Sequence, residues 1–162
     1  TISSPHTHAP AMLASTLLCL VVGVFDGDTV LARCGPANSY ALTKVRIAAI
    51  DAPEKQQPYG QQAKQALAAL CHRQQATIQP KAIDRYGRVV ADVRCQGEDA
   101  VRYLVSQGMA WVYSRYAKGY GDLYLFEEEA QSARRGLWAD AHPVPPWQWA
   151  SRKHPQRLHT KP

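Results

Sequence analysis

Two short stretches of the chain each read as an apolar strand that ends in carboxylates. Residues 24–30 have the sequence V-F-D-G-D-T-V, and residues 45–54 have the sequence V-R-I-A-A-I-D-A-P-E. An arginine, Arg46, stands inside the second apolar run. Converging carboxylates make a site for a hard cation, and an arginine beside them makes a site for phosphate. A fold that joins these two strand ends therefore has the parts of a metal-assisted phosphate site.

The length and charge of the chain set the range of partners. Its 162 residues fit one domain with a core of its own. There are 19 Lys and Arg against 13 Asp and Glu, which gives a net charge of +6. That balance favours an anionic partner, of which nucleic acid is the commonest. An anionic membrane surface would suit the same sign, and a basic charge also serves solubility alone.

The four cysteines offer two interpretations. Cys19, Cys34, Cys71 and Cys95 form no C-x-x-C pair, which argues against a zinc knuckle. All four lie in or beside apolar segments, so they are either buried thiols or two disulfides of an exported domain. Cys19 and Cys34 lie almost symmetrically about Asp26-Gly27, and a hairpin there would bring them near each other. This suggests the pairs Cys19–Cys34 and Cys71–Cys95.

The hydrophobic pattern predicts five strands, over residues 17–24, 29–33, 41–50, 76–79 and 88–95. Helices are predicted after Pro58-Tyr59-Gly60, after Asp99, and from Leu123 to Leu137, where apolar residues recur at spacings of three and four. Three strands, a helix, two strands and trailing helices is the element order of an OB-fold barrel. The predicted class is therefore α+β, with a five-stranded barrel and about three helices.

The ends of the chain differ in composition from its middle. We expect a loose N-terminal segment over residues 1–16, one folded domain over 17–141, and a Pro- and Trp-rich, then basic, tail over 142–162. The uncharged run 11–25 resembles the apolar part of a signal peptide, but no Lys or Arg precedes it and it leads straight into Asp26-Gly27. It is also too short for a membrane span. A buried strand is the better interpretation.

Asp28 and Asp51, at the two strand ends, are the candidate metal ligands. Calcium accepts many oxygen ligands in a forgiving geometry, often including waters. Ala52 precedes Pro53, which favours an extended backbone that can turn the Ala52 carbonyl outward as a further ligand. The alternatives are that Asp28 is a turn residue after Gly27 and that Asp51 caps a strand end.

Arg46, Glu54 and Arg88 are candidates for chemistry on a phosphate. A charge inside an apolar strand needs water, an ion pair or an arriving anion, so Arg46 either pairs with an Asp or lines a binding site. Glu54 is either a general base beside a metal or a solvated loop charge. Arg88 follows a predicted turn at residues 84–87 and is otherwise an ordinary exposed arginine. Together they supply what phosphodiester cleavage needs: a neutralised phosphate, a base, and two guanidinium groups.

The motifs D-G-D-T, V-R-I-A-A-I-D-A-P-E and D-R-Y-G-R, in this order, resemble the staphylococcal nuclease (thermonuclease) family. The resemblance runs from about Leu17 to Trp138, through V-R-Y-L-V-S-Q-G-M-A and A-R-R-G-L-W-A-D. It implies an OB-fold nuclease that uses calcium and cleaves DNA and RNA to 3′-phosphate products.

The resemblance also implies a metal site made by named residues. Asp28 and Asp51 would be the carboxylate ligands of calcium, and Asp26 would be a further acid close to the ion. Ala52 would give its backbone carbonyl, at a position where the family often has threonine. A carbonyl ligand survives that change, although any help from the threonine hydroxyl is lost.

The implied substrate site uses the same motifs. Arg46 and Arg88 would bind the phosphate, and Glu54 would be the general base. Further substrate contacts would come from one residue near a terminal phosphate and two aromatics beside the nucleotide: Arg85, Tyr86 and Tyr116. Tyr113 is one position off the family pattern, and its role stays open.

Three functions compete at this point. The first is a calcium-dependent nuclease that acts on DNA and RNA, prefers single-stranded or breathing substrate, and is secreted or periplasmic and monomeric, with no membrane partner. The second is a non-catalytic nucleic-acid-binding module on the same barrel, as in degenerate relatives that lose the arginines or the acids. The third is an anion-binding protein for membranes or polysaccharides, which rests on charge only. The presence of all five residues of the proposed site favours the enzyme.

Overall fold

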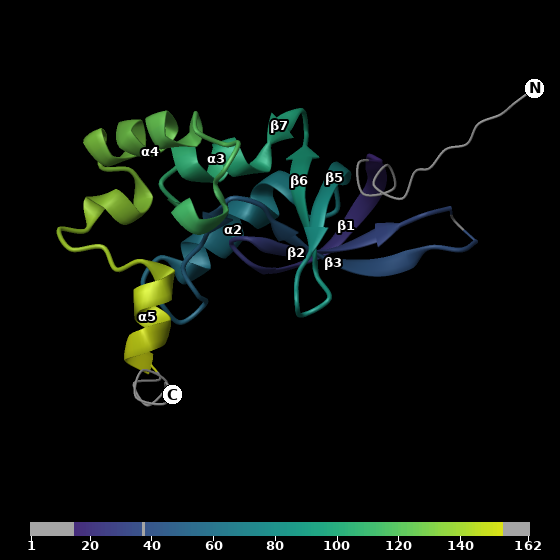
Figure 1. Cartoon of the computed structure of the whole chain (residues 1–162), viewed down its shortest axis with the longest axis horizontal. Helices are drawn as coiled ribbons and strands as arrows, with labels where there is room; N and C mark the ends of the chain where they lie inside the picture. The colour runs from purple at the N-terminus through teal and green to yellow at the C-terminus, as the bar shows by residue number, and fades with distance from the viewer. Residues whose placement is uncertain (1–14, 37, 154–162) are drawn as a thin grey trace, which may run out of the picture.

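The computed structural model describes residues 15–36 and 38–153, so most of the predicted N-terminal segment lies outside the described residues. Five long strands form the barrel: β1 (Leu17–Asp26), β2 (Thr29–Cys34), β3 (Ala41–Ile47), β5 (Gln75–Ile83) and β6 (Val89–Cys95). They lie in the order β3-β2-β1-β5-β6, and a parallel pairing between β3 and β6 closes the sheet on itself (Figure 1). The predicted α+β barrel of OB type is confirmed.

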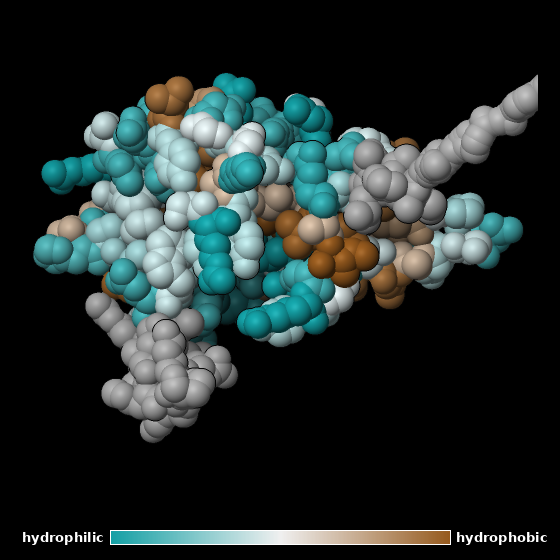
Figure 2. All heavy atoms as spheres, viewed as in Figure 1, coloured by the Kyte–Doolittle hydropathy of each residue, from teal (hydrophilic) through white to brown (hydrophobic). Residues whose placement is uncertain are grey.

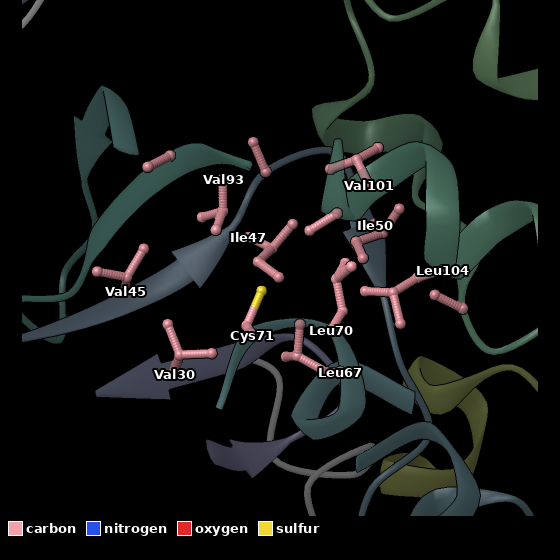
Figure 3. Packing of buried hydrophobic residues seen from close by; sticks show 14 of the residues in the cluster. Val30, Val45, Ile47, Ile50, Leu67, Leu70, Cys71, Val93, Val101 and Leu104 are labelled. Carbon is pink, nitrogen blue, oxygen red and sulfur yellow. The ribbon is translucent and has the colours of Figure 1, made fainter. Parts of the chain in front are cut away.

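Alternating side chains of the strands fill the barrel. Val30, Val45, Ile47 and Val93 are fully buried, as the period of two along a strand requires. Helix α2 (Gly60–Cys71) adds Leu67 and other apolar side chains to the same cluster (Figure 3). Each such side chain stabilises the fold by roughly 1.5–3 kcal/mol relative to an exposed position. The strands of this packed barrel carry Asp26 and Arg46.

The remaining helices gather at one end of the barrel, and the β2–β3 hairpin extends at the other (Figure 1). They are α3 (Ala100–Ser106), α4 (Leu123–Ser132) and α5 (Pro146–Lys153), with short 3-10 turns η1 (Ser114–Tyr116) and η2 (Gly136–Ala139). The prediction of one helix from Leu123 to Leu137 was too long. The helix ends at Ser132, and Arg134 takes a left-handed backbone with φ 55° that no α-helix continues through.

The predicted strand over residues 41–50 was also wrong in its last part. Strand β3 ends at Ile47, and Ala49 has a left-handed φ of 71°. The chain then starts the two-residue strand β4 (Ile50–Asp51), which pairs with β8 (Trp111–Val112) in a separate small sheet. The strand over 76–79 was predicted too short, since β5 runs from Gln75 to Ile83. It contains Pro80, which lies next to a register shift, a place where a strand tolerates proline. The two-residue strand β7 (Glu98–Asp99) extends the sheet beyond β6.

Two disulfides join Cys19 to Cys34 and Cys71 to Cys95, the pairs that the sequence suggested. Cys19 and Cys34 are direct partners in the β1–β2 register, and the second bridge ties the end of α2 to the end of β6. Among the described residues, no helix has the length and apolar character of a membrane span. The face in Figure 2 is mostly hydrophilic, and its largest hydrophobic area lies over the barrel strands.

Candidate functional site

The turn between β1 and β2 is pressed into the body of the protein. Gly27 stands at its tip, where an added Cβ would lie 2.7 Å from the Cβ of Ala63 on α2 and 2.8 Å from the Cβ of Ala52. Only glycine fits such a close approach. The Asp28 backbone N–H donates to Oδ1 of Asp26 at 3.1 Å, so the first acid shapes the turn that carries the second.

Asp28 joins this turn to the end of β4. Its side chain is buried, and Oδ2 accepts the backbone N–H of Ala52 at 2.8 Å while Oδ1 accepts the Thr29 hydroxyl at 2.9 Å. Asp51, next to Ala52, is partly buried. The two acidic strand ends therefore lie together, although they are more than 20 residues apart in the sequence.

Arg46 fills the space between these acids and the turn that follows β3. Its Nη1 donates to the carbonyls of Ile47 at 2.7 Å and Ile50 at 2.9 Å, so one end of the guanidinium closes the turn. Its Nη2 lies 3.3 Å from Oδ1 of Asp51 and 3.6 Å from Oδ2 of Asp28. The arginine thus serves the fold and faces the carboxylates at the same time.

Three carboxylates and one guanidinium leave this cluster with too much negative charge. Burial, and the nearby Asp28 carboxylate, raise the pKa of Asp26 and that of Asp51 to about 7, although Arg46 opposes both shifts. Like charges that crowd in a partly desolvated place disfavour ionisation unless a cation arrives. The cluster is therefore electrostatically suited to a positive ion.

The donor set fits a hard cation that also takes waters and carbonyls. In residues 15–36 and 38–153, no three His, Cys, Asp or Glu side chains are arranged to hold a metal ion by themselves. A carboxylate oxygen accepts more than one bond, so Asp28 keeps capacity after its contacts with Ala52 and Thr29. An all-oxygen set of few carboxylates is what calcium tolerates, whereas zinc prefers nitrogen and sulfur.

Arg88 lies next to the first residue of β6, the strand that pairs with the Arg46 strand β3. In the parallel β3–β6 pairing, Arg46 is in register with Val90, and Arg88 stands in the chain directly before β6, two residues ahead of Val90. Asp84 fixes its direction: Oδ2 accepts from Arg88 Nε at 2.7 Å, and Oδ1 accepts the backbone N–H of Tyr86 and of Arg88. Partial desolvation works against ionisation, but these hydrogen bonds lower the pKa of Asp84.

Tyr86 and Arg85 lie at the exposed tip of the same turn. The Tyr86 side chain is 69% exposed, and the guanidinium carbons of Arg85 and Arg88 lie 5.1 Å and 5.5 Å from its ring centroid. Both guanidinium groups lie over the ring, at cation–π distance. The turn therefore places an exposed aromatic ring next to two arginines.

Glu54 stands two residues after Ala52, at the start of the loop that leads to α2. Glu54 is partly exposed, and in the described part of the chain no donor hydrogen-bonds to its side-chain carboxylate. Its backbone N–H donates to Oε1 of the buried Gln57 at 3.2 Å. The backbone of Glu54 is thus held while its side chain is left accessible.

The aromatic residues that follow β8 form a group of three rings with Trp147 of α5. Tyr116 is 61% exposed, and it contacts the edge of Tyr113 with ring centroids 5.1 Å apart. Tyr113 lies between Tyr116 and Trp147 of α5, on which it stacks at 5.1 Å and 14°. Tyr113 is therefore the centre of this group, and its backbone N–H donates to the Ala49 carbonyl beside the Arg46 turn.

Sequence reasoning missed two supporting residues. Asp84 begins the D-R-Y-G-R turn, and the preference of aspartate for accepting the backbone N–H two residues on was a usable signal. Gln57 had no such signal, because its role depends on a partner 87 residues away.

Comparison with known proteins is consistent with this geometry. Residues 44–140 match the family described as staphylococcal nuclease homologue. A protein of Haemophilus influenzae named "Uncharacterized endonuclease" is 41% identical over 132 residues, covering 81% of this chain and 71% of that protein. A "Micrococcal nuclease" of Shigella flexneri is 37% identical over 139 residues, covering 80% and 78%. A "Staphylococcal-like nuclease CAN1" of Arabidopsis thaliana is 36% identical over 110 residues, covering 68% and 34%.

Proposed function

Because the chain belongs to the staphylococcal nuclease family, we propose that it is a calcium-dependent nuclease that hydrolyses phosphodiester bonds of DNA and RNA. The observation that carries this proposal is the cluster of Asp26, Asp28 and Asp51 around Arg46, with Arg88 directly before β6, the strand that pairs with the Arg46 strand β3. Relatives named endonuclease and micrococcal nuclease support the reaction class.

The metal part of the proposal assigns Asp28, Asp51 and the Ala52 carbonyl as ligands, with Asp26 close by. A bound calcium ion would neutralise phosphate charge and lower the pKa of a water. Arg46 and Arg88 would bind the non-bridging oxygens of the phosphate and stabilise the charge that develops there. For Arg46, the Nη2 side of the guanidinium is the part that faces the acids, since Nη1 is used by the turn.

Glu54 would act on the attacking water. It would take a proton from the water as the water oxygen bonds to phosphorus. The bond from phosphorus to the 5′ oxygen would break, and the 5′ oxygen would take a proton from solvent, giving a 3′-phosphate and a 5′-hydroxyl. A second possibility is that Glu54 only orders the loop and nearby waters. Glu54→Gln keeps the size of the side chain and removes its basicity, whereas Glu54→Asp keeps the base and withdraws it by one methylene.

The enzyme and the non-catalytic module are separated by one assay. Plasmid DNA and RNA are incubated with the protein in calcium and in chelator, alongside Glu54→Gln and, as a matched control, Glu128→Gln on the exposed side of α4. We expect cleavage in calcium, none in chelator, and a loss of about 10²–10⁴-fold for Glu54→Gln alone. Binding without cleavage in calcium would identify the module instead.

The substrate and location follow from the same features. Exposed rings at Tyr86 and Tyr116 suit unstacked bases, so single-stranded or breathing nucleic acid is the preferred substrate. Two disulfides persist in an oxidising compartment, which supports a secreted or periplasmic protein. We propose that the protein acts as a monomer.

A further inference from the structure

The segment after residue 140, which lies beyond the family match, is packed against the loop that carries Glu54. Gln57 Nε2 donates to the carbonyl of Val144 at 2.6 Å. Next to this bond is a hollow of about 40 Å³, lined by Gln57, Pro58, Val144 and Trp149 among others. A ligand pocket for a nucleotide needs roughly 300 Å³ or more, so this contact is a support rather than a binding pocket.

Gln57 is the centre of the loop between Glu54 and Gly60. It is 4% exposed, and both ends of its amide are used: Oε1 accepts the Glu54 N–H, and Nε2 reaches Val144. Its own backbone N–H donates to the Glu54 carbonyl, and its carbonyl accepts from Gly60, each at 2.9 Å. An added Cβ on Gly60 would lie 1.8 Å from the Glu54 carbonyl oxygen, so the loop is closed as tightly as glycine allows.

The same C-terminal segment is fixed at a second point. Trp147 stacks on Tyr113 at 5.1 Å, and Pro146 beside it is buried at the start of α5. The segment therefore spans from the Glu54 loop to the strand end at β8. A support that is held at both ends resists movement better than one held at a single hydrogen bond.

We propose that Gln57 is a positioning residue for Glu54, and that residues Pro143–Trp149 are the support against which Gln57 is held. This rests on the proposed function, in which Glu54 acts on the attacking water. Gln57 does not touch substrate; it holds the Glu54 backbone through one hydrogen bond to its N–H and one to its carbonyl. A misplacement of about 1 Å at a reacting group is enough to cost on the order of 10²-fold in rate.

Two full-chain variants test this. Gln57→Met keeps the volume and removes both side-chain bonds, and Gln57→Glu keeps the acceptor for the Glu54 N–H but removes the donor to Val144. The control is Gln96→Met, which removes an equivalent side-chain bond to the carbonyls of Ala69 and Leu70 at the far end of α2. The substrate is a single-stranded DNA oligonucleotide at saturating calcium, with kcat and KM measured separately.

For Gln57→Met we expect kcat to fall by about 10–10²-fold with KM changed by less than about threefold, and Gln96→Met to stay near the parent. In a Glu54→Gln background, Gln57→Met should add no further loss of kcat, because it acts through the missing base. In the calcium-free protein, the Glu54 amide should exchange its hydrogen faster in Gln57→Met, and the amides of Gln148 and Trp149 faster in Gln57→Glu.

The outcomes separate this inference from the proposed function. An unchanged kcat in folded Gln57→Met, or the same loss with and without Glu54→Gln, would overturn the positioning role. Unchanged exchange at the Glu54 amide would overturn it as well, whatever the activity. Full activity of Glu54→Gln by itself would refute the base assignment, while the exchange measurement would still decide whether Gln57 holds the loop.

Discussion

Replacing Arg46 by lysine tests whether geometry or charge matters at the acidic cluster. The guanidinium reaches four oxygens: the carbonyls of Ile47 and Ile50 through Nη1, and the carboxylates of Asp51 and Asp28 through Nη2. Lysine places one nitrogen at the end of its stem, so it can satisfy one pair of these oxygens but not both.

The size of the effect follows from the bonds that are lost. If the ammonium stays with the carboxylates, two carbonyls of the Ala48–Ala49 turn lose their donor. A hydrogen bond to a charged donor contributes about 1.5–3 kcal/mol, and partial access to water reduces that, so we expect Arg46→Lys to lower the free energy of unfolding by roughly 2–3 kcal/mol. Loss of a planar donor to the phosphate should lower kcat by on the order of 10²-fold or more.

The free energy of unfolding and kcat can both be measured on one preparation of the protein. Urea unfolding of the calcium-free protein gives stability, and cleavage of a DNA oligonucleotide in saturating calcium gives kcat at a temperature where the variant is folded. Arg94→Lys is the matched control, because Arg94 is exposed and donates to a single carbonyl, that of Gly97. Its stability should change by less than about 0.5 kcal/mol. A fully stable and fully active Arg46→Lys would show that positive charge alone suffices.

Three further outcomes are expected. Asp84→Asn should keep the fold of its turn but release Arg88 Nε, lowering kcat by about 10-fold or more while melting temperature changes little; equal losses in kcat and in calcium affinity would contradict this. The Asp51 carboxyl has a folded pKa of about 7 against 3.8 unfolded. The calcium-free native state therefore binds more protons, so its stability should fall as pH rises from about 4 to 7. Calcium affinity should be higher in titrations at pH 8 than in titrations at pH 5. Replacing both cysteines of the Cys71–Cys95 bridge by alanine should cost roughly 3 kcal/mol in urea unfolding, since the bridge closes a separation of 24 residues; an unchanged midpoint would mean that the bridge does not form.

The barrel was predictable because its strands carry their own signals. Residues 17–24 and 29–33 flank an Asp-Gly turn, and in each strand two buried side chains stand two residues apart: Cys19 and Val21, and Val30 and Ala32. The break after Ile47 was not predictable, because Ala48 and Ala49 have no turn preference. Tertiary hydrogen bonds set it: Ala48 N–H donates to Ala91, and Ala49 accepts from Tyr113. The turn after Ile47, which brings Arg46 close to the acids, therefore depends on residues far away in the sequence.

The C-terminal segment was also only partly predictable from the sequence. Its prolines suggested a tail, yet Pro146 stands at the first position of α5, where a missing N–H costs nothing. The sequence could have marked this helix start. It could not show that Trp147 stacks on Tyr113 or that Val144 accepts from Gln57, because no local pattern records contacts across such separations.

The charge balance of the cluster explains why these acids and this arginine occur together. Fully ionised, Asp26, Asp28 and Asp51 carry three negative charges, and Arg46 offsets one of them. The remainder equals the charge of one divalent cation. Without the cation, the raised pKa values of Asp26 and Asp51 favour their protonated forms near neutrality. With a cation bound, both groups would ionise, and Nη2 of Arg46 could turn from the carboxylates to an anion. In the proposed function, a phosphodiester would bring negative charge that a cation and two arginines can hold, so the charge imbalance that disfavours the cluster alone would favour binding of metal and substrate together.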